Sequence, residues 1–167
     1  MKRLLVVFGL PGAGKSYVAQ LLKTECGYLI HDGDDDIPKH MREALFRKKI
    51  ITDDMRAQFT ANMIASVKKL TQAHDKLVVH QTFLKEFMRR QFLEAFPYAT
   101  FILVQTPDKL RETRYLNRVY FNLGLDYLRH MSGLFETPKI PHKTVKNEHE
   151  GEEKILSQLA RIIPDNL

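Results

Sequence analysis

The 167-residue sequence has a single cysteine, Cys26, and no tryptophan. One cysteine excludes an intramolecular disulfide, which fits a protein that works in the reducing cytoplasm. Long apolar runs are missing as well, since none approaches the roughly 18 residues that cross a membrane. The apolar run near the N-terminus ends at Pro11 and Gly12, too early for a signal peptide. We therefore expect a cytoplasmic protein with no membrane partner.

Long runs of like charge are also absent, although the net charge is +6 and the pI is near 9.4. The longest basic run is Arg47, Lys48 and Lys49, and acidic clusters interrupt the basic ones. This distribution disfavours nucleic acid as a partner without excluding it, and it suits a small anionic substrate. The sequence leaves open whether two copies form a homodimer.

Strand-like and helix-like patterns alternate along the chain, and its composition, 44% hydrophobic and 28% charged, is that of a folded domain. The alternation predicts a single α/β domain over residues 1–167, with helices on both faces of a parallel sheet of four or five strands. Strands are expected at 4–8, 28–30, 77–79, 101–104 and 144–146, and helices at 15–26, after 38, and at 52–73, 83–95, 108–118 and 152–163.

Residues 9–16 read Gly-Leu-Pro-Gly-Ala-Gly-Lys-Ser and match the Walker A pattern between an expected strand and an expected helix. The glycines let the backbone curl so that successive amide groups point at an anion, and the following helix adds the positive end of its dipole. Lys15 should reach the β and γ phosphates, and Ser16 should offer its hydroxyl to Mg²⁺. The loop predicts ATP with Mg²⁺, bound by Gly12, Ala13, Gly14, Lys15, Ser16 and Tyr17.

The absence of two further motifs narrows the class of P-loop protein. No Asp-x-x-Gly and no Asn-Lys-x-Asp occurs, which argues against a GTPase, and the strand near residue 79 lacks the terminal Asp of motor ATPases. The acidic residues Asp32 and Asp34 instead follow the second strand, whose end should meet the phosphate loop at one edge of the sheet. We expect Asp32 to serve the metal, and Asp34 to orient an acceptor hydroxyl and take its proton. This arrangement predicts phosphoryl transfer.

Together these motifs resemble the gluconate kinase and shikimate kinase group of small P-loop kinases. The segment Asp32-Gly33-Asp34 is followed by Pro38 and by Asp53-Asp54-Met55-Arg56 at the spacing of gluconate kinases. The resemblance covers roughly residues 4–160. It implies a three-layer P-loop NTPase fold, the use of ATP, a sugar acid such as gluconate as the acceptor, and a lid at residues 119–138 that closes over both substrates.

Two further residues are expected to contact the acceptor. Arg56 should clamp an acidic group, because a guanidinium fork matches a carboxylate. His80 lies at the end of the third expected strand and should line the acceptor site.

Four more residues are expected to contact nucleotide or acceptor. Arg111, Arg114 and Arg118 are spaced to share one face of a helix. The resemblance places Arg114 near the adenine and Arg118 near the transferred phosphoryl group, where its charge would act catalytically. It also implies that Asn147 contacts the adenine, and Arg129 is a further candidate for a phosphate or the substrate.

Two other functions stay open. Ile37 and Phe59 occupy positions where gluconate kinases have a histidine and a tryptophan in the acceptor pocket. A nucleoside, nucleotide or polynucleotide 5′-hydroxyl kinase would keep the same transfer machinery and could hold a base with Phe59, His80 and Gln81. The third possibility is an ATP-binding regulatory module without a small acceptor, which would bind ATP but show no acceptor-stimulated turnover.

Overall fold

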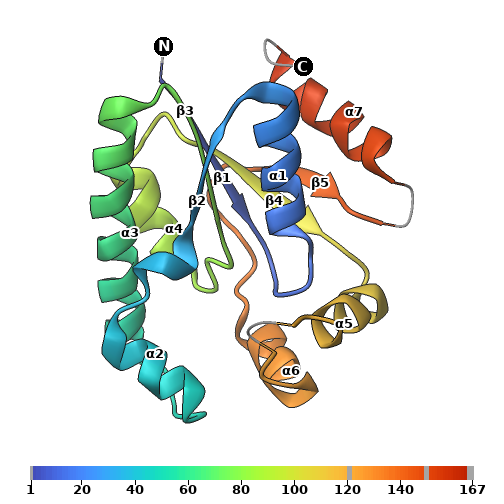
Figure 1. Ribbon diagram of the computed structural model, residues 1–167. Helices are drawn as coiled ribbons and strands as arrows, with labels where there is room; N and C mark the ends of the chain where they lie inside the picture. The colour runs from blue at the N-terminus through green and yellow to red at the C-terminus, as the bar shows by residue number, and fades with distance from the viewer. Residues whose placement is uncertain (1, 120–121, 149–150, 165–167) are drawn as a thin grey trace.

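The computed structural model describes residues 2–119, 122–148 and 151–164, and a parallel sheet forms its centre (Figure 1). The sheet is five-stranded, with strand order β2-β3-β1-β4-β5, and every neighbouring pair is parallel. The prediction of a parallel sheet is therefore confirmed. Its strands are Arg3–Phe8 (β1), Leu29–Asp32 (β2), Lys76–Gln81 (β3), Thr100–Gln105 (β4) and Lys143–Lys146 (β5).

Helices cover both faces of this sheet and complete three layers (Figure 1). Because side chains alternate along a strand, Leu5 and Val7 of β1 pack on the side of α1 and α7, while Leu4 and Val6 pack on the side of α3 and α4. The helices are Lys15–Cys26 (α1), Lys39–Phe46 (α2), Asp53–Ala73 (α3), Glu86–Ala95 (α4), Asp108–Leu116 (α5), Leu125–Leu134 (α6) and Glu152–Ile162 (α7).

Helix boundaries follow the predicted signals where these are local. Gly27 ends α1 with a φ of 71°, a left-handed conformation that glycine adopts without strain. The Thr52 hydroxyl accepts a hydrogen bond from the Met55 amide at 3.2 Å and so caps α3. No helix in the described ranges combines the length and apolar character of a membrane span.

Several predicted boundaries are wrong. Strand β2 continues to Asp32, because Asp32 pairs in register with His80. Helix α4 begins at Glu86 rather than 83, since Phe83 has a φ of 48°, outside the right-handed helical range. Helix α5 ends at Leu116 rather than 118. The segment expected to form a lid, 119–138, includes residues 120–121, which lie outside the described residues. Helix α6, which was not predicted, lies within this segment, and the role as a lid stays a prediction.

A fully buried arginine, Arg89, holds the segment before α4 to the segment after α6. Its guanidinium donates hydrogen bonds to the carbonyls of Phe83 at 2.9 Å, Leu84 at 3.3 Å and Glu136 at 2.7 Å. It also pairs with the Glu86 carboxylate at 2.8 Å. Phe83 and Leu84 line the pocket described below, so Arg89 supports one of its walls from behind.

Arg89→Met should lower the free energy of unfolding by about 3–5 kcal/mol, because it leaves a buried carboxylate and buried carbonyls without their donor. The matched control is Arg90→Met, since the Arg90 side chain is 62% exposed and lies only 3.7 Å from the same Glu86. Urea denaturation followed by circular dichroism measures both changes. Equal losses in the two variants would contradict the supporting role of Arg89.

Candidate active site

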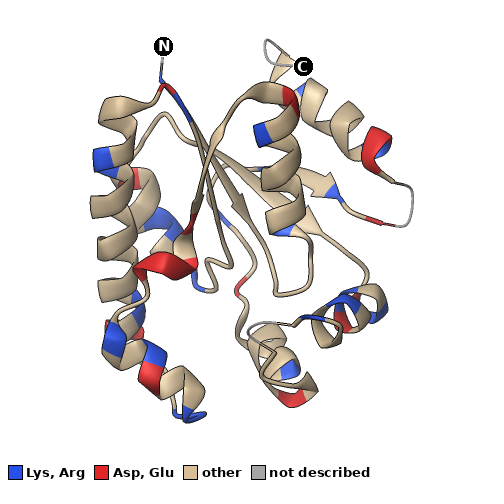
Figure 2. Cartoon of the chain, in the orientation of Figure 1, with Lys and Arg blue, Asp and Glu red and all other residues tan. Residues whose placement is uncertain are grey.

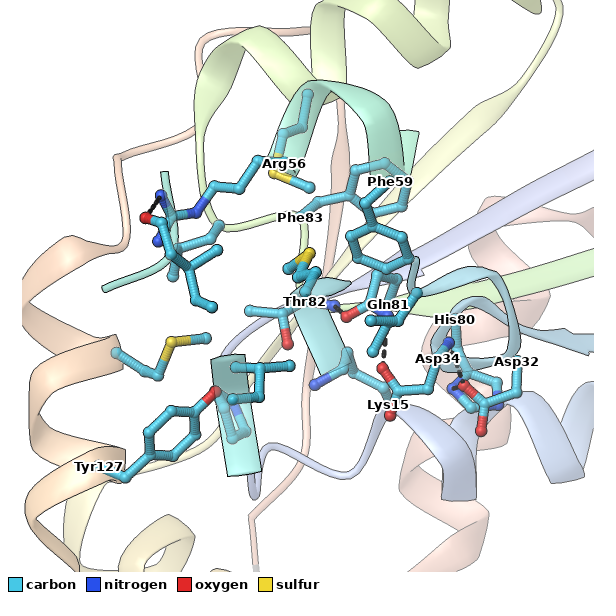
Figure 3. Close-up of a pocket in the computed structure, with 18 of the residues that line it drawn as sticks. Lys15, Asp32, Asp34, Arg56, Phe59, His80, Gln81, Thr82, Phe83 and Tyr127 are labelled. Atoms are coloured by element: carbon cyan, nitrogen blue, oxygen red, sulfur yellow. Dashed lines mark hydrogen bonds and ion pairs between the residues drawn. The ribbon is translucent and has the colours of Figure 1, made fainter. Parts of the chain in front are cut away.

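A pocket opens where the carboxyl ends of β1, β2 and β3 meet (Figure 3). The strand order places these three ends side by side, as expected for a ligand crevice in a parallel sheet. Figure 2 shows the acidic turn Gly33–Asp36 (η1) at the end of β2. The pocket's polar wall consists of Lys15, Ser16, Asp32, Asp34, His80 and Arg118.

The phosphate loop has no room for side chains at two of its glycines. Gly12 and Gly14 have φ values of 83° and 93°. A Cβ on Gly12 would lie 2.4 Å from the Arg111 carbonyl oxygen, and one on Gly14 would lie 2.1 Å from Asn147 Nδ2. The Asn147 amide also donates to the Ala13 carbonyl at 2.9 Å. The buried Asn147 therefore holds the loop in shape, while its contact with adenine stays a prediction.

Lys15 is buried, with 8% of its surface exposed, and its Nζ donates to the Leu10 carbonyl at 3.1 Å. Burial, and next the charge of Arg118, lower the pKa of Lys15 to about 7, although Asp34 and Asp32 oppose this shift. The carboxylates nearby thus compensate the ammonium group only in part. A bound phosphate would supply the missing negative charge, which fits the predicted role of Lys15.

Two carboxylates of the acidic segment 32–36 line the pocket, and a third fastens the turn to α3. Asp32 Oδ1 accepts from the Asp34 amide at 2.9 Å, and the Asp32 side chain remains 45% exposed. Asp34 Oδ1 accepts from Gln81 Nε2 at 2.7 Å. Asp36 instead accepts from the Ser66 hydroxyl at 2.5 Å and so fastens the turn to α3. Asp32 and Asp34 are the two that line the pocket, as predicted.

Ser16 and Asp32 form a set of oxygen donors that suits Mg²⁺. This ion keeps several waters and takes one or two protein ligands together with substrate phosphates. Within the described ranges, no group of three or more histidine, cysteine, aspartate or glutamate side chains could hold a metal by itself. An ion at this place would therefore depend on the phosphates of a nucleotide.

His80 and Arg118 complete the polar wall. His80 Nδ1 lies 3.8 Å from Asp32 Oδ1, and burial lowers the pKa of His80 although Asp32 opposes this shift. The Arg118 guanidinium lies over the Tyr115 ring, 5.4 Å from its centroid, just beyond the end of α5. Arg118 thereby reaches the pocket beside Lys15 without belonging to the helix.

Arg111 and Arg114 both reach the region of the phosphate loop from α5, whereas Arg118 lies beyond the end of that helix, so the predicted face of three arginines holds only for the first two. Arg111 is buried, and it donates to the Pro11 carbonyl at 3.3 Å and to the Ser132 hydroxyl at 3.0 Å. It thus connects the phosphate loop to α6. Arg114 Nη1 donates to the Asn147 carbonyl at 3.3 Å, on the side of β5.

Two predicted site residues lie away from the pocket. The Arg129 side chain is 63% exposed, and its Nε lies 3.3 Å from Glu112 Oε1. The Tyr17 hydroxyl donates to Glu152 Oε2 at 3.2 Å, toward α7. The structure brings neither side chain to the residues that line the pocket.

Arg56 does line the pocket, on the side opposite Asp32 and Asp34 (Figure 3). It is buried, and its Nη1 donates to the Ile51 carbonyl at 2.7 Å and to Asp53 Oδ1 at 3.1 Å. These contacts fix the guanidinium in place at the wall.

Sequence reasoning missed the contribution of α6. Tyr127 and Met131 both line the pocket from this helix. Burial, and next the charges of Tyr115 and Asp34, raise the pKa of Tyr127 to about 12, although Arg56 opposes this shift, so its hydroxyl stays neutral. The i, i+4 spacing of Tyr127 and Met131 was the available signal for one helix face.

The fold and the phosphate loop together define a P-loop protein with a kinase-type architecture. The chain matches the AAA domain family over residues 4–138, and it belongs to that family. Comparison with curated proteins finds no significant sequence match.

Solved structures give the same picture of the fold. A sugar kinase from Janibacter sp. HTCC2649 has a TM-score of 0.83 at 17% identity, over 98% of this chain and 95% of that one. A gluconokinase from Sinorhizobium meliloti 1021 has a TM-score of 0.77 at 22% identity, over 98% and 94%. A thymidylate kinase from Candida albicans has a TM-score of 0.66 at 13% identity, over 99% and 92%. The resemblance to the gluconate and shikimate kinase group is thereby confirmed as one of fold.

Lys15→Met should raise the melting temperature of the free protein at pH 6.5 while removing nucleotide binding. Because the pKa of Lys15 falls from 10.5 to about 7 on folding, the folded protein binds fewer protons than the unfolded chain between these values. The destabilisation is therefore complete below about pH 7 and fades as the pH rises toward 10.5.

Thermal melts of both proteins at pH 6.5 and pH 9 test this prediction, and the gain should be larger at pH 6.5. A Lys15→Met protein that melts below the wild type at pH 6.5 would show instead that the bond from Nζ to the Leu10 carbonyl stabilises the loop.

Proposed function

We propose that the protein is an ATP-dependent kinase that transfers the γ-phosphoryl group of ATP to a hydroxyl of a small molecule. The observation that carries this proposal is the continuity of one pocket from Lys15, past Asp34, to Arg56. An acceptor held between Asp34 and Arg56 would present a hydroxyl to a phosphate cradled by the loop. Family membership and the fold shared with structures named sugar kinase and gluconokinase support the same reading.

The residues of the polar wall divide the transfer between them. The acceptor oxygen bonds to the γ-phosphorus, the bond from that phosphorus to the β–γ bridging oxygen breaks, ADP leaves, and the hydroxyl proton passes to the Asp34 carboxylate. Gln81 holds Oδ1 of Asp34 and so aims the other oxygen. Lys15 and Arg118 stabilise charge on the transferred group. Mg²⁺, held by Ser16 and Asp32 with the phosphates, would neutralise charge on the nucleotide when bound.

Arg56 and the lid complete the proposal. Arg56 would pair with an acidic group of the acceptor. The resemblance to gluconate kinases makes a sugar acid such as gluconate the first candidate by sequence. Closure of the segment that contains α6 would exclude water from the transfer. A nucleoside or nucleotide acceptor is the second candidate, favoured by the aromatic rings of Phe59 and Tyr127 in the pocket. A regulatory ATP-binding module would show no stimulation of turnover by any acceptor.

Asp34→Asn should lower kcat by about a hundredfold or more while the affinity for ATP stays nearly constant, because a general base acts in the transition state. Asp35→Asn is the matched control, since Asp35 is the exposed neighbour in the same turn. ADP release under saturating ATP measures kcat, and calorimetry measures ATP affinity. An equal loss of ATP affinity in Asp34→Asn would assign Asp34 to the metal instead.

Arg118→Ala should lower kcat by about a hundredfold to a thousandfold, as expected when a donor to developing charge is removed. Arg129→Ala should leave kcat unchanged, because Arg129 pairs with Glu112 outside the pocket. The two variants show which of the two arginines takes part in phosphoryl transfer, a question that the sequence alone left open. A large loss in Arg129→Ala and none in Arg118→Ala would reverse the assignment.

A further inference from the structure

The pocket has two unlike ends. Opposite the polar wall lies a second wall made of carbon and sulfur atoms, here called the apolar wall. The side chains of this wall come from the residue that follows η1 and from helices α2, α3, α4 and α6. Segments far apart in the sequence therefore meet at this wall. Its residues are Ile37, Met41, Phe59, Met88, Tyr127 and Met131.

Part of this apolar wall is only half-buried in the free protein. Met41, Phe59 and Met88 belong to the core beneath the pocket. Ile37, Tyr127 and Met131 are of intermediate exposure and lie across the pocket's rim. Apolar surface left partly open inside a pocket gains free energy when a ligand covers it, provided the ligand is itself apolar there.

Polar side chains at this end are few, namely Thr82, Tyr127 and Arg56 (Figure 3). Gln81 is committed at both ends of its amide, since Nε2 donates to Asp34 and Oε1 accepts from the Thr82 amide at 2.6 Å. A polyol would bury more hydroxyl groups against this wall than these side chains can pair with, and each unpaired group costs free energy. A nucleobase would meet the same difficulty along its polar edge.

One charged donor remains at the far end. In the described part of the chain, the hydrogen bonds that Arg56 donates all come from Nη1, which leaves Nε and Nη2 for a ligand. Tyr127 lines the same pocket as Asp34 and Arg56, from helix α6 (Figure 3). A ligand that spans the pocket from Asp34 to Arg56 would therefore contact Tyr127 with the part that lies between the ligand's hydroxyl and the ligand's acidic group.

From these features we infer that the acceptor is an alcohol with an aromatic or otherwise apolar body and a single acidic group, rather than a polyhydroxy acid or a nucleoside. The hydroxyl faces Asp34, the body packs against the rings and methionines of the apolar wall, and the acid pairs with Arg56. This inference rests on the proposed kinase function, because it names the substrate class of the same site.

The test compares acceptors that place their groups differently. The probe is 4-(hydroxymethyl)benzoate, which carries one hydroxyl and one carboxylate across a ring. Gluconate, shikimate and uridine represent the polyhydroxy acids and the nucleosides, and 4-methylbenzyl alcohol lacks the acid. ADP release with MgATP gives kcat/KM, and calorimetry in the presence of ADP gives acceptor affinity. We expect kcat/KM for the probe to exceed that of gluconate, shikimate and uridine at least tenfold.

Variants locate the probe in the pocket. Met131→Gln should weaken binding of the probe by about threefold to tenfold, because it replaces the apolar contact between Met131 and the probe's ring with a polar amide. His130→Gln is the matched control on the exposed side of the same helix and should change nothing. Arg56→Gln should weaken the probe by about tenfold to a hundredfold and leave 4-methylbenzyl alcohol unaffected.

The outcomes separate this inference from the proposed function. A preference for gluconate, shikimate or uridine would overturn the inference while the kinase function stands. Binding of the probe that depends on Met131 and Arg56, without any phosphoryl transfer, would support the inference about the occupant and overturn the kinase function. Failure to bind both nucleotide and probe would overturn both.

Discussion

The ammonium group of Lys15 lies where water reaches it poorly and where the protein compensates its charge only in part. This constraint organises the rest of the site. A buried cation with a lowered pKa costs stability in the free protein, and an anion that enters the loop removes that cost. The loop can hold this arrangement because Gly12 and Gly14 leave no room for side chains and because Arg111 and Asn147 fasten the loop from outside.

The two pocket carboxylates are placed so that they do not simply neutralise Lys15. Asp32 is partly exposed and bonded to the backbone of its own turn, and Asp34 is oriented by Gln81. If either formed a direct ion pair with Lys15, the ammonium group would be less available to phosphate. Their separation from Lys15 therefore leaves one carboxylate for a metal and the other for an acceptor hydroxyl.

Most of the fold and the polar wall could be predicted from the sequence, because their signals are local. Apolar runs specify buried strands, and the glycine loop and the acidic turn must follow β1 and β2. Arg118 was assigned to a helix face that ends two residues earlier, since the sequence carries no stop signal such as Gly or Pro near Leu116. Helix α6 was not predicted, although Tyr127, Leu128 and Met131 fall within one helix face, with Leu128 in the core and the other two at the pocket.

The apolar wall could not be predicted for a different reason. Its residues come from helices that the sheet brings together, and each of them alone reads as ordinary core. The transfer residues, in contrast, lie at the carboxyl edge of the sheet and just beyond the end of α5. Because the two sets lie on different elements, a helix side chain such as Met131 can change without moving Lys15 or Asp34. The motifs that identify the phosphate loop therefore constrain the chemistry of transfer, while the choice of acceptor is left to side chains whose proximity only the folded chain reveals.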